Sequence, residues 1–211
     1  MSGVVLTTNV AVAQPDPGGA NRLSGIDKRA VDSGIEVFAP GPDYGDGSGV
    51  VGDVVGDSLH HGGRHKAVYA FEREQLDFWD RDYRNGYFGE NLTTTGIDLS
   101  SVLINQRFQV GGAVLEVSVP RRPCRTFGAW LERQGWMKTF TAHGKVGAYF
   151  RVIEPGQIMP GAELVALDEP SHGVTMGMAF RAKMGDKDLA RRVVAAGCLP
   201  GRYHEELLRL I

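Results

Sequence analysis

Glycine is the residue that most restricts how this chain can fold. The sequence of 211 residues contains 29 glycines, and they are spread along its whole length. Glycine permits tight turns and backbone positions with positive φ, and each one weakens the interior of a helix. We therefore expect a domain rich in strands and turns, and we do not expect a helical bundle. The length suits one large domain, alone or with a small appendage.

The composition excludes several classes of protein. Hydrophobic residues make up 42% of the chain and charged residues 23%, which are globular values. A net charge of −2 gives no global attraction for nucleic acid, so local clusters must hold any bound anion. With two cysteines, Cys124 and Cys198, the chain has neither a disulfide framework nor the ligands of a four-cysteine iron–sulfur cluster. No apolar stretch approaches the roughly 20 residues of a membrane span.

The first residues have some features of a secretion signal. Residues 4–13 are mostly apolar and end in Ala-Val-Ala, but no Lys or Arg precedes Arg22. A signal peptide needs a positively charged start. We therefore interpret this segment as a strand and expect a cytoplasmic protein with reduced thiols. We expect neither nucleic acid nor a membrane as a partner.

Short apolar runs bounded by Gly and Pro predict most of the strands. The Gly111-Gly112 pair between two of these runs indicates a hairpin. The predicted strands cover residues 4–12, 35–39, 50–55, 67–71, 102–104, 107–110, 113–119, 147–153 and 162–167.

Helical periodicity is found in fewer places. Leu76, Trp79 and Tyr83 lie at helical spacing and predict a helix over 72–83, and a second helix is expected over 131–140. After Asp168-Glu169-Pro170 the pattern changes to three short helices, over 175–183, 188–196 and 202–210. We predict a β-rich α+β domain over 1–169 and a small α-helical segment over 170–211.

Cys124 is the residue most indicative of chemistry. It follows the strand that ends at Val119, within the run Pro120-Arg121-Arg122-Pro123-Cys124-Arg125. Neighbouring positive charge favours the thiolate form of a cysteine, and thiolate is a ligand for soft or high-valent transition metals. The same arginines could hold phosphate. A structural cysteine in a surface loop fits the local pattern equally well. Cys198 has no charged neighbours and is expected to be a small buried residue.

A second cluster is His60-His61-Gly62-Gly63-Arg64-His65-Lys66. Paired glycines let backbone N–H groups approach an anion, and the basic residues add charge. His61 and His65 are four residues apart, which suggests zinc, but the glycines between them oppose the helix that would align them. A charged surface turn is the alternative.

Two further segments could contact a ligand. In Gly89-Glu90-Asn91-Leu92 a glycine turn could present Asn91, although an ordinary capped loop has the same pattern. In His143-Gly144-Lys145-Val146-Gly147 the Lys145 ammonium could reach a phosphate, although a solvated lysine is the default.

Taken in order, these segments resemble the MOSC family, the molybdenum cofactor sulfurase C-terminal domain, and in particular its stand-alone bacterial members of the YiiM type. The resemblance runs from about residue 20 to 168, and the helical tail is similar to the three helices that follow the core in those members. Its motifs are Gly56-Asp57, His61-Gly62-Gly63, Lys66-Ala67-Val68-Tyr69, Phe88-Gly89-Glu90-Asn91-Leu92, Pro120-Arg121-Arg122-Pro123-Cys124 and Gly144-Lys145-Val146-Gly147.

The resemblance implies a β-barrel-like, strand-rich domain that binds molybdenum cofactor (molybdopterin). It implies that Cys124 is the catalytic residue and the protein ligand to molybdenum. It also implies that the pterin and its phosphate contact the basic and glycine-containing segments. The cofactor-contact candidates on this basis are Lys28, His61, Gly62, Gly63, Asn91, Arg121 and Lys145.

The activity implied by the resemblance is reduction of N-hydroxylated compounds, such as amidoximes and hydroxylamino-purines. Such a molybdenum-dependent oxidoreductase would need a separate redox partner protein as electron donor, because no flavin or iron–sulfur signature occurs here. A homodimer is also implied. The pyridoxal-phosphate sulfurase domain of eukaryotic relatives is not recognised, so we do not expect sulfur transfer from free cysteine.

Two other functions use the same residues. The domain could be a non-catalytic carrier of molybdenum cofactor or of a persulfide on Cys124. Alternatively, Cys124 could be the nucleophile of a hydrolase with His61 or His65 as its base. The basic residues of the helical tail are diluted by acidic ones, so we expect a docked segment or a dimer contact and not a nucleic-acid face.

Overall fold

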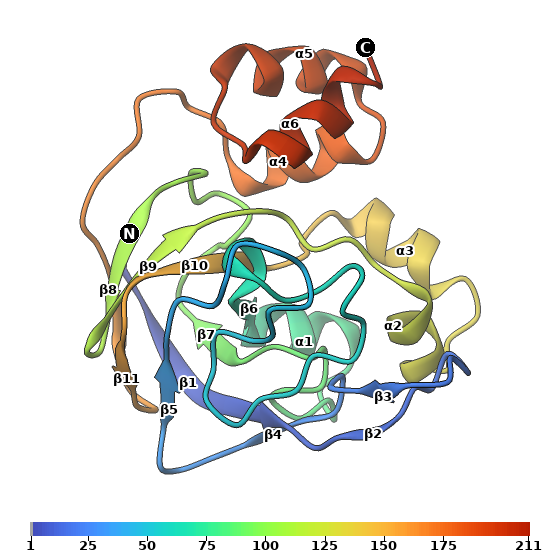
Figure 1. Ribbon diagram of the computed structural model, residues 1–211, viewed down its shortest axis with the longest axis vertical. Helices are drawn as coiled ribbons and strands as arrows, with labels where there is room; N and C mark the ends of the chain where they lie inside the picture. The colour runs from blue at the N-terminus through green and yellow to red at the C-terminus, as the bar shows by residue number, and fades with distance from the viewer. Residues whose placement is uncertain (1) are drawn as a thin grey trace.

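Seven strands close into a β-barrel within residues 2–211, the part of the chain that the computed structural model describes (Figure 1). The parallel pair β6–β7 is flanked by antiparallel neighbours around the rest of the barrel. β1 pairs with both β7 and β12, which closes the sheet. Around the barrel the order is β12 (Glu163–Ala166), β8 (Arg107–Val110), β9 (Ala113–Val117), β10 (Ala148–Glu154), β6 (Val68–Glu72), β7 (Leu92–Thr95) and β1 (Ser2–Ala11).

The long strand β1 organises one side of the molecule. Its register shifts between Val5 and Thr7, so the first half of the strand pairs with β12 and the last residues pair with β4 (Lys28–Ala30). A shift of this kind bends and twists a strand. β1 therefore reaches from the barrel wall to the segment that carries Lys28. Four shorter strands form two separate pairs outside the barrel: β2 (Gln14–Pro15) pairs with β3 (Leu23–Ser24), and β5 (Ile35–Val37) pairs with β11 (Gly156–Ile158).

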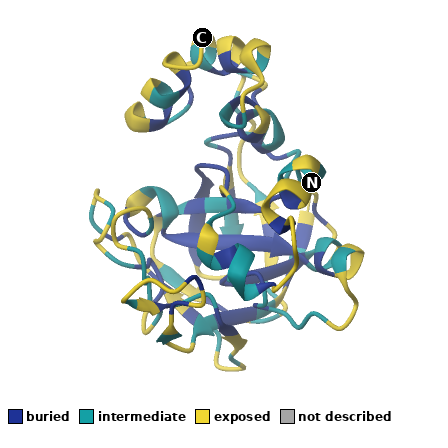
Figure 2. Cartoon of the chain, turned by 90° about the vertical axis from the view of Figure 1, so that its right-hand side faces the viewer, coloured by how far each residue is buried: buried dark blue, intermediate teal, exposed yellow. Residues whose placement is uncertain are grey.

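Two groups of buried residues hold the fold together. Aliphatic side chains fill the barrel, whose strands are mostly dark blue in Figure 2. A second group is aromatic and packs beneath helices α1 (Arg73–Trp79), α2 (Arg125–Trp130) and α3 (Trp136–His143). In that group the Phe88 ring lies 5.1 Å from the Phe127 ring and 5.6 Å from the Trp136 ring, in edge-on geometry. Such edge-on contacts are favourable, and they fix α2 on the barrel.

The C-terminal helices form a separate layer above the barrel, shown in orange and red in Figure 1. They are α4 (Met176–Lys183), α5 (Lys187–Ala196) and α6 (Gly201–Leu208). Side chains cap two of them: Thr175 accepts from Met178 N–H and Asp186 from Leu189 N–H. Among the helices of residues 2–211, none combines the length and apolar character that a membrane crossing requires. The division of the chain near residue 170 stays a prediction.

Two predicted strands are wrong. Residues 50–55 contribute only a bridge from Val50 to Val37, because the chain turns at Gly52, which has a φ of 76°. The turn points the Asp53 carboxylate inward. Residues 102–104 form a turn in which Leu103 bridges to Thr175, so this apolar run anchors the C-terminal helices instead of joining the barrel.

The predicted helices also need correction. The helix expected over 72–83 ends at Trp79, because Asp80 is extended. The helix expected over 131–140 is interrupted, because Glu132 and Gly135 both have positive φ. Its second part belongs to α3, and the six-residue helix α2 before the interruption was not predicted.

Glu72 is a buried carboxylate whose ionisation opposes folding. Its side chain is 2% exposed, Oε1 accepts from Leu99 N–H at 2.9 Å, and Oε2 has no hydrogen-bond partner. Burial raises the pKa of Glu72 from 4.5 to about 7. The folded state therefore keeps a proton that the unfolded state loses between these pH values, and stability decreases as pH rises through that range.

We expect Glu72→Gln to remove this pH dependence. Between pH 5 and pH 8 the free energy of unfolding of the wild type should fall by roughly 1–3 kcal/mol more than that of the variant. Urea denaturation at both pH values measures the difference, with exposed Glu36→Gln as the control. Equal pH dependence in wild type and Glu72→Gln would contradict the assignment.

Candidate functional site

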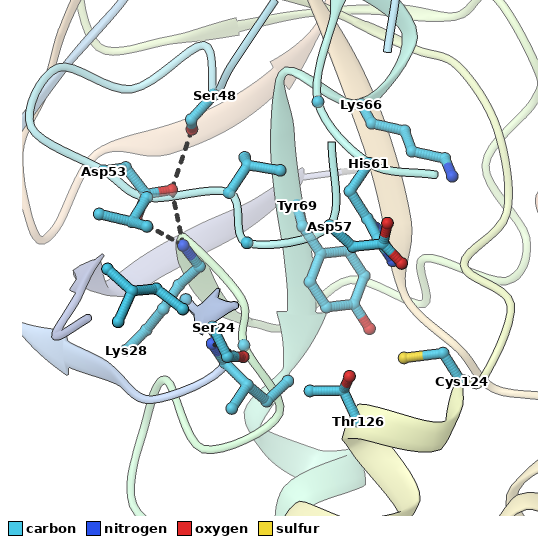
Figure 3. Close-up of a pocket in the computed structure, with 18 of the residues that line it drawn as sticks. Ser24, Lys28, Ser48, Asp53, Asp57, His61, Lys66, Tyr69, Cys124 and Thr126 are labelled. Carbon is cyan, nitrogen blue, oxygen red and sulfur yellow. Dashed lines mark hydrogen bonds and ion pairs between the residues drawn. The ribbon is translucent and has the colours of Figure 1, made fainter. Parts of the chain in front are cut away.

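A cavity of about 720 Å³, including its open mouth, lies beside strands β6 and β10 (Figure 3). Three irregular segments, residues 16–28, 48–66 and 121–126, supply most of its wall. Tyr69 and Tyr149 of the barrel line its floor, where their rings lie 5.0 Å apart. The cavity therefore joins regions that are far apart in the sequence and lie together only in the folded chain.

Cys124 stands at the point where a strand region changes into a helix. Barrel pairing continues past β9 as far as Val119, whose carbonyl accepts from Tyr149 N–H at 3.1 Å. Pro120 and Pro123 then prevent further pairing, and Cys124 is the N-cap residue of α2. Its thiol is free and half-buried, and its sulfur points into the cavity in Figure 3.

Arg121 is the one arginine of the Cys124 run that lines the cavity. It is buried, and its guanidinium donates to the Phe88 carbonyl. Its central carbon lies 4.7 Å from the Tyr69 ring centre and 4.1 Å from that of Phe127. Aromatic faces attract a guanidinium and hold its plane in place. Arg121 is thus a fixed positive charge near the thiol.

The His61-Gly62-Gly63 turn forms the opposite wall. Gly62 and Gly63 both have positive φ, and a Cβ on Gly63 would lie 2.1 Å from the Asp43 carbonyl oxygen, so only glycine fits. Burial, together with the positive charges of Lys66 and Arg121, lowers the pKa of His61 to about 3. The His61 ring is therefore neutral at pH 7 and faces the cavity as a hydrogen-bonding group.

Lys28 and Asp53 form a buried ion pair at the other end of the cavity. Lys28 Nζ lies 2.6 Å from both Asp53 carboxylate oxygens. Asp53 also accepts from Ala11 N–H at 2.8 Å and from Ser48 Oγ and Asn91 Nδ2 at 2.9 Å each. Burial by itself would raise the pKa of Asp53, but Lys28 and these donors hold it below its usual value.

Lys66 lies on the Cys124 side of the cavity. Its Nζ donates to the His60 carbonyl at 2.6 Å and faces the rings of Tyr44 and Tyr149, at 4.7 and 5.7 Å from their centres. Burial lowers the pKa of Lys66 to about 8, and the positive charge of Lys183 adds to the effect. Lys66 is still mainly protonated at neutral pH.

The charges of the cavity do not balance. Arg22 bridges Asp16 and Asp57 at 2.8 and 3.0 Å, and Lys28 neutralises Asp53. Within residues 2–211, neither Arg121 nor Lys66 has a carboxylate within ion-pair distance. The cavity lining therefore has four cations against three carboxylates, and this excess of positive charge suits an anionic ligand.

The structure collects six of the eight residues singled out from the sequence. Two others lie elsewhere. Gly63 packs behind the cavity wall, and Lys145 pairs with exposed Asp98 at 2.7 Å because the turn at Gly144 directs it away. The six that line the cavity are Lys28, His61, Gly62, Asn91, Arg121 and Cys124.

Some cavity residues were not singled out from the sequence. Lys66 and Asp57 stand inside motifs that were recognised, so a signal for them existed. Asp53 follows Gly52 within an apparent strand, and Tyr149 lies in an ordinary strand, so neither had one. Among residues 2–211, no group of three or more His, Cys, Asp or Glu is placed to hold a metal ion.

The family sequence model of the MOSC domain matches residues 57–165, which is just over half of the sequence. The chain therefore belongs to the MOSC domain family. YflK of Bacillus subtilis strain 168 is 35% identical over 139 residues, which are 64% of this chain and 63% of YflK. Less than two thirds of YflK is thus matched. Protein YiiM of Escherichia coli K12 is 29% identical over 159 residues, 71% of each chain. A protein named Reductase, from Gibberella moniliformis, is 31% identical over 138 residues, but these are only 24% of its length.

Solved structures agree on the fold. YiiM from Geobacillus stearothermophilus superimposes with a TM-score of 0.76 at 24% identity, over 99% of this chain and 98% of that one. YiiM from Escherichia coli gives a TM-score of 0.73 at 24% identity, over 99% and 92%. The predicted β-rich α+β fold, with a barrel and a C-terminal three-helix segment, is confirmed.

We expect Asp53→Ala to destabilise the protein by about 3–5 kcal/mol, because it leaves the buried Lys28 ammonium without its partner. Ser48→Ala, which removes one of the hydrogen bonds to the same carboxylate, should cost only about 1 kcal/mol. Urea denaturation at pH 7 measures both. Similar small losses in the two variants would mean that water reaches Lys28 and compensates its charge.

Proposed function

We propose that this chain binds molybdenum cofactor in the cavity and reduces N-hydroxylated compounds such as amidoximes and hydroxylamino-purines. The observation that carries the proposal is the Cys124 thiol, which points into a cavity where Arg121 and Lys66 have no carboxylate partner. Membership of the MOSC family supports the choice of cofactor. The relative named Reductase supports the type of reaction.

The residues present fit this cofactor. Cys124 offers one thiolate, a donor type that suits soft and high-valent metals. Arg121 and Lys66 are placed to neutralise an anionic ligand, and Arg121 can bind phosphate oxygens in bidentate fashion. Lys28 is already neutralised by Asp53, so it would contact the cofactor as a hydrogen-bonding group.

The protein residues would have distinct tasks in the reaction. When bound, the cofactor supplies two-electron chemistry that takes the oxygen from nitrogen and releases it as water, with electrons from a separate donor protein. Cys124 would hold the metal in place. His61, neutral at pH 7, can hydrogen-bond to the substrate without adding charge. Lys66 Nζ, with a pKa of about 8, carries a proton that it gives up more readily than an ordinary lysine.

We expect wild-type protein from a host that makes molybdopterin to contain about one molybdenum per chain, and Cys124→Ser to contain none, because the hydroxyl is a poor substitute for thiolate. Cys198→Ser is the matched control. Its thiol is buried outside the cavity and should not affect the metal. Elemental analysis gives the metal content, and benzamidoxime reduction with an artificial electron donor gives the activity.

The possible outcomes separate the candidate functions. Wild type without molybdenum, from cells that load a control molybdenum enzyme, would refute the proposal. Molybdenum in the wild type without turnover of any N-hydroxylated compound would favour a cofactor carrier. Full reductase activity in Cys124→Ser would exclude Cys124 as the metal ligand.

A further inference from the structure

A second group of charged and aromatic residues joins the barrel to the C-terminal helices. We call it the tyrosine junction: Tyr44, Lys66, Lys183, Arg202 and Tyr203. The hydroxyls of Tyr44 and Tyr203 are hydrogen-bonded to each other, although the two residues are 159 positions apart. Tyr203 is buried and belongs to the first turn of α6. The loop before Lys66 is thereby attached to the last helix of the chain.

Three cations surround the two phenol rings. Lys66 Nζ and the Arg202 guanidinium lie 4.7 and 4.3 Å from the centre of the Tyr44 ring. Lys183 Nζ lies 4.4 Å from the centre of the Tyr203 ring. The carboxylate that pairs with this group is Glu206, at 2.5 Å from Lys183 and 3.8 Å from Arg202. Three positive charges thus face one negative charge, within the part of the chain that the structure describes.

The tyrosine junction and the cavity share one residue. Lys66 belongs to both, and Tyr149, over which Lys66 also lies, lines the cavity floor. In Figure 3 Lys66 and Cys124 are on one side of the cavity, and Lys28 and Asp53 are on the other. Lys66 therefore stands between the proposed metal ligand and the cations of the C-terminal helices.

We propose that the tyrosine junction binds a phosphate group of the substrate, so that the enzyme acts on phosphorylated N-hydroxylated compounds, such as N-hydroxylated nucleotides, in preference to uncharged ones. This inference rests on the proposed function. Arg202 provides a planar pair of donors for phosphate oxygens, and two ammonium groups and two phenol hydroxyls stand beside it. A phosphate here would offset the excess of positive charge, since three cations face the single carboxylate of Glu206.

Arg202 is the best residue for a test, because its side chain is 61% exposed and its loss should not affect folding. Arg209 lies at the other end of α6, has a similarly exposed side chain (76%) and pairs with Glu205. Arg202→Gln and Arg209→Gln therefore remove the same charge from the same helix, near and far from the tyrosine junction. Tyr203→Phe, which keeps the ring, tests the hydroxyl.

The first experiment is calorimetric titration of the full-length protein with adenosine 5′-monophosphate, adenosine and inorganic phosphate at low salt. The monophosphate should bind wild type at least about tenfold more tightly than adenosine does. Arg202→Gln should weaken monophosphate binding about tenfold and leave adenosine unchanged. Arg209→Gln should match wild type. Equal affinity for adenosine and its 5′-monophosphate, or equal losses in the two arginine variants, would overturn the proposal.

The second experiment separates a substrate phosphate from the phosphate of the cofactor. Arg202→Gln made in a molybdopterin-producing host should contain as much molybdenum as wild type. Loss of molybdenum in this variant would assign the tyrosine junction to the cofactor and overturn the proposal. If the loaded wild type reduces N-hydroxyadenosine and its 5′-monophosphate, Arg202→Gln should lower the preference for the monophosphate about tenfold, through KM. If it reduces neither, the proposed reductase function fails, and the titration still decides whether the phosphate site exists.

Discussion

The ion pair between Lys28 and Asp53 is the interaction on which the cavity depends. It joins strand β4 to the loop after Gly52, and the same carboxylate receives hydrogen bonds from Ala11 of β1, from Ser48 and from Asn91. Taking two charges out of water is costly, and the cost is offset only when the geometry is good and the remaining acceptor sites are satisfied. Here they are satisfied. One buried carboxylate therefore ties the loop of residues 48–53, which has only a bridge from Val50 to Val37, to the paired strands β1 and β4 and to Asn91.

A consequence of this pairing is the uneven charge of the cavity. The carboxylates of the cavity wall are already paired, Asp16 and Asp57 with Arg22 and Asp53 with Lys28. Arg121 and Lys66 are held by carbonyl groups and aromatic rings instead. Carbonyl groups and rings position a cation but leave most of its charge available to a ligand. The thiol of Cys124 therefore faces the positive side of the cavity. A metal-bound anionic cofactor and an anionic substrate would both be attracted to that side.

The sequence predicted the strands and the chemistry better than it predicted their arrangement. Alternating and apolar runs located six of the seven barrel strands, and the charged run around Cys124 indicated a ligand site. The strand that was missed is β7, because its polar sequence Leu-Thr-Thr-Thr was interpreted as part of a loop. The failures have physical causes. An apolar run such as 50–55 forms a turn when a glycine adopts positive φ and a neighbouring carboxylate enters a buried ion pair. The local sequence pattern shows neither the φ of the glycine nor the partner of the carboxylate. Lys145 shows the same limit, since one turn at Gly144 decides which way the side chain points.

The C-terminal helices have a role that no single segment of the sequence indicates. Lys66, Lys183 and Arg202 come from three separate parts of the chain, and each is ordinary in its local context. The fold brings them around two bonded tyrosines with one carboxylate for compensation. Like charges held this close repel one another, and after burial this repulsion contributes to the lowered pKa of half-buried Lys66. A fold usually accepts such a local cost where a ligand removes it. These repelling charges lie beside the part of the cavity that holds Cys124. For this reason we assign the tyrosine junction to the substrate phosphate.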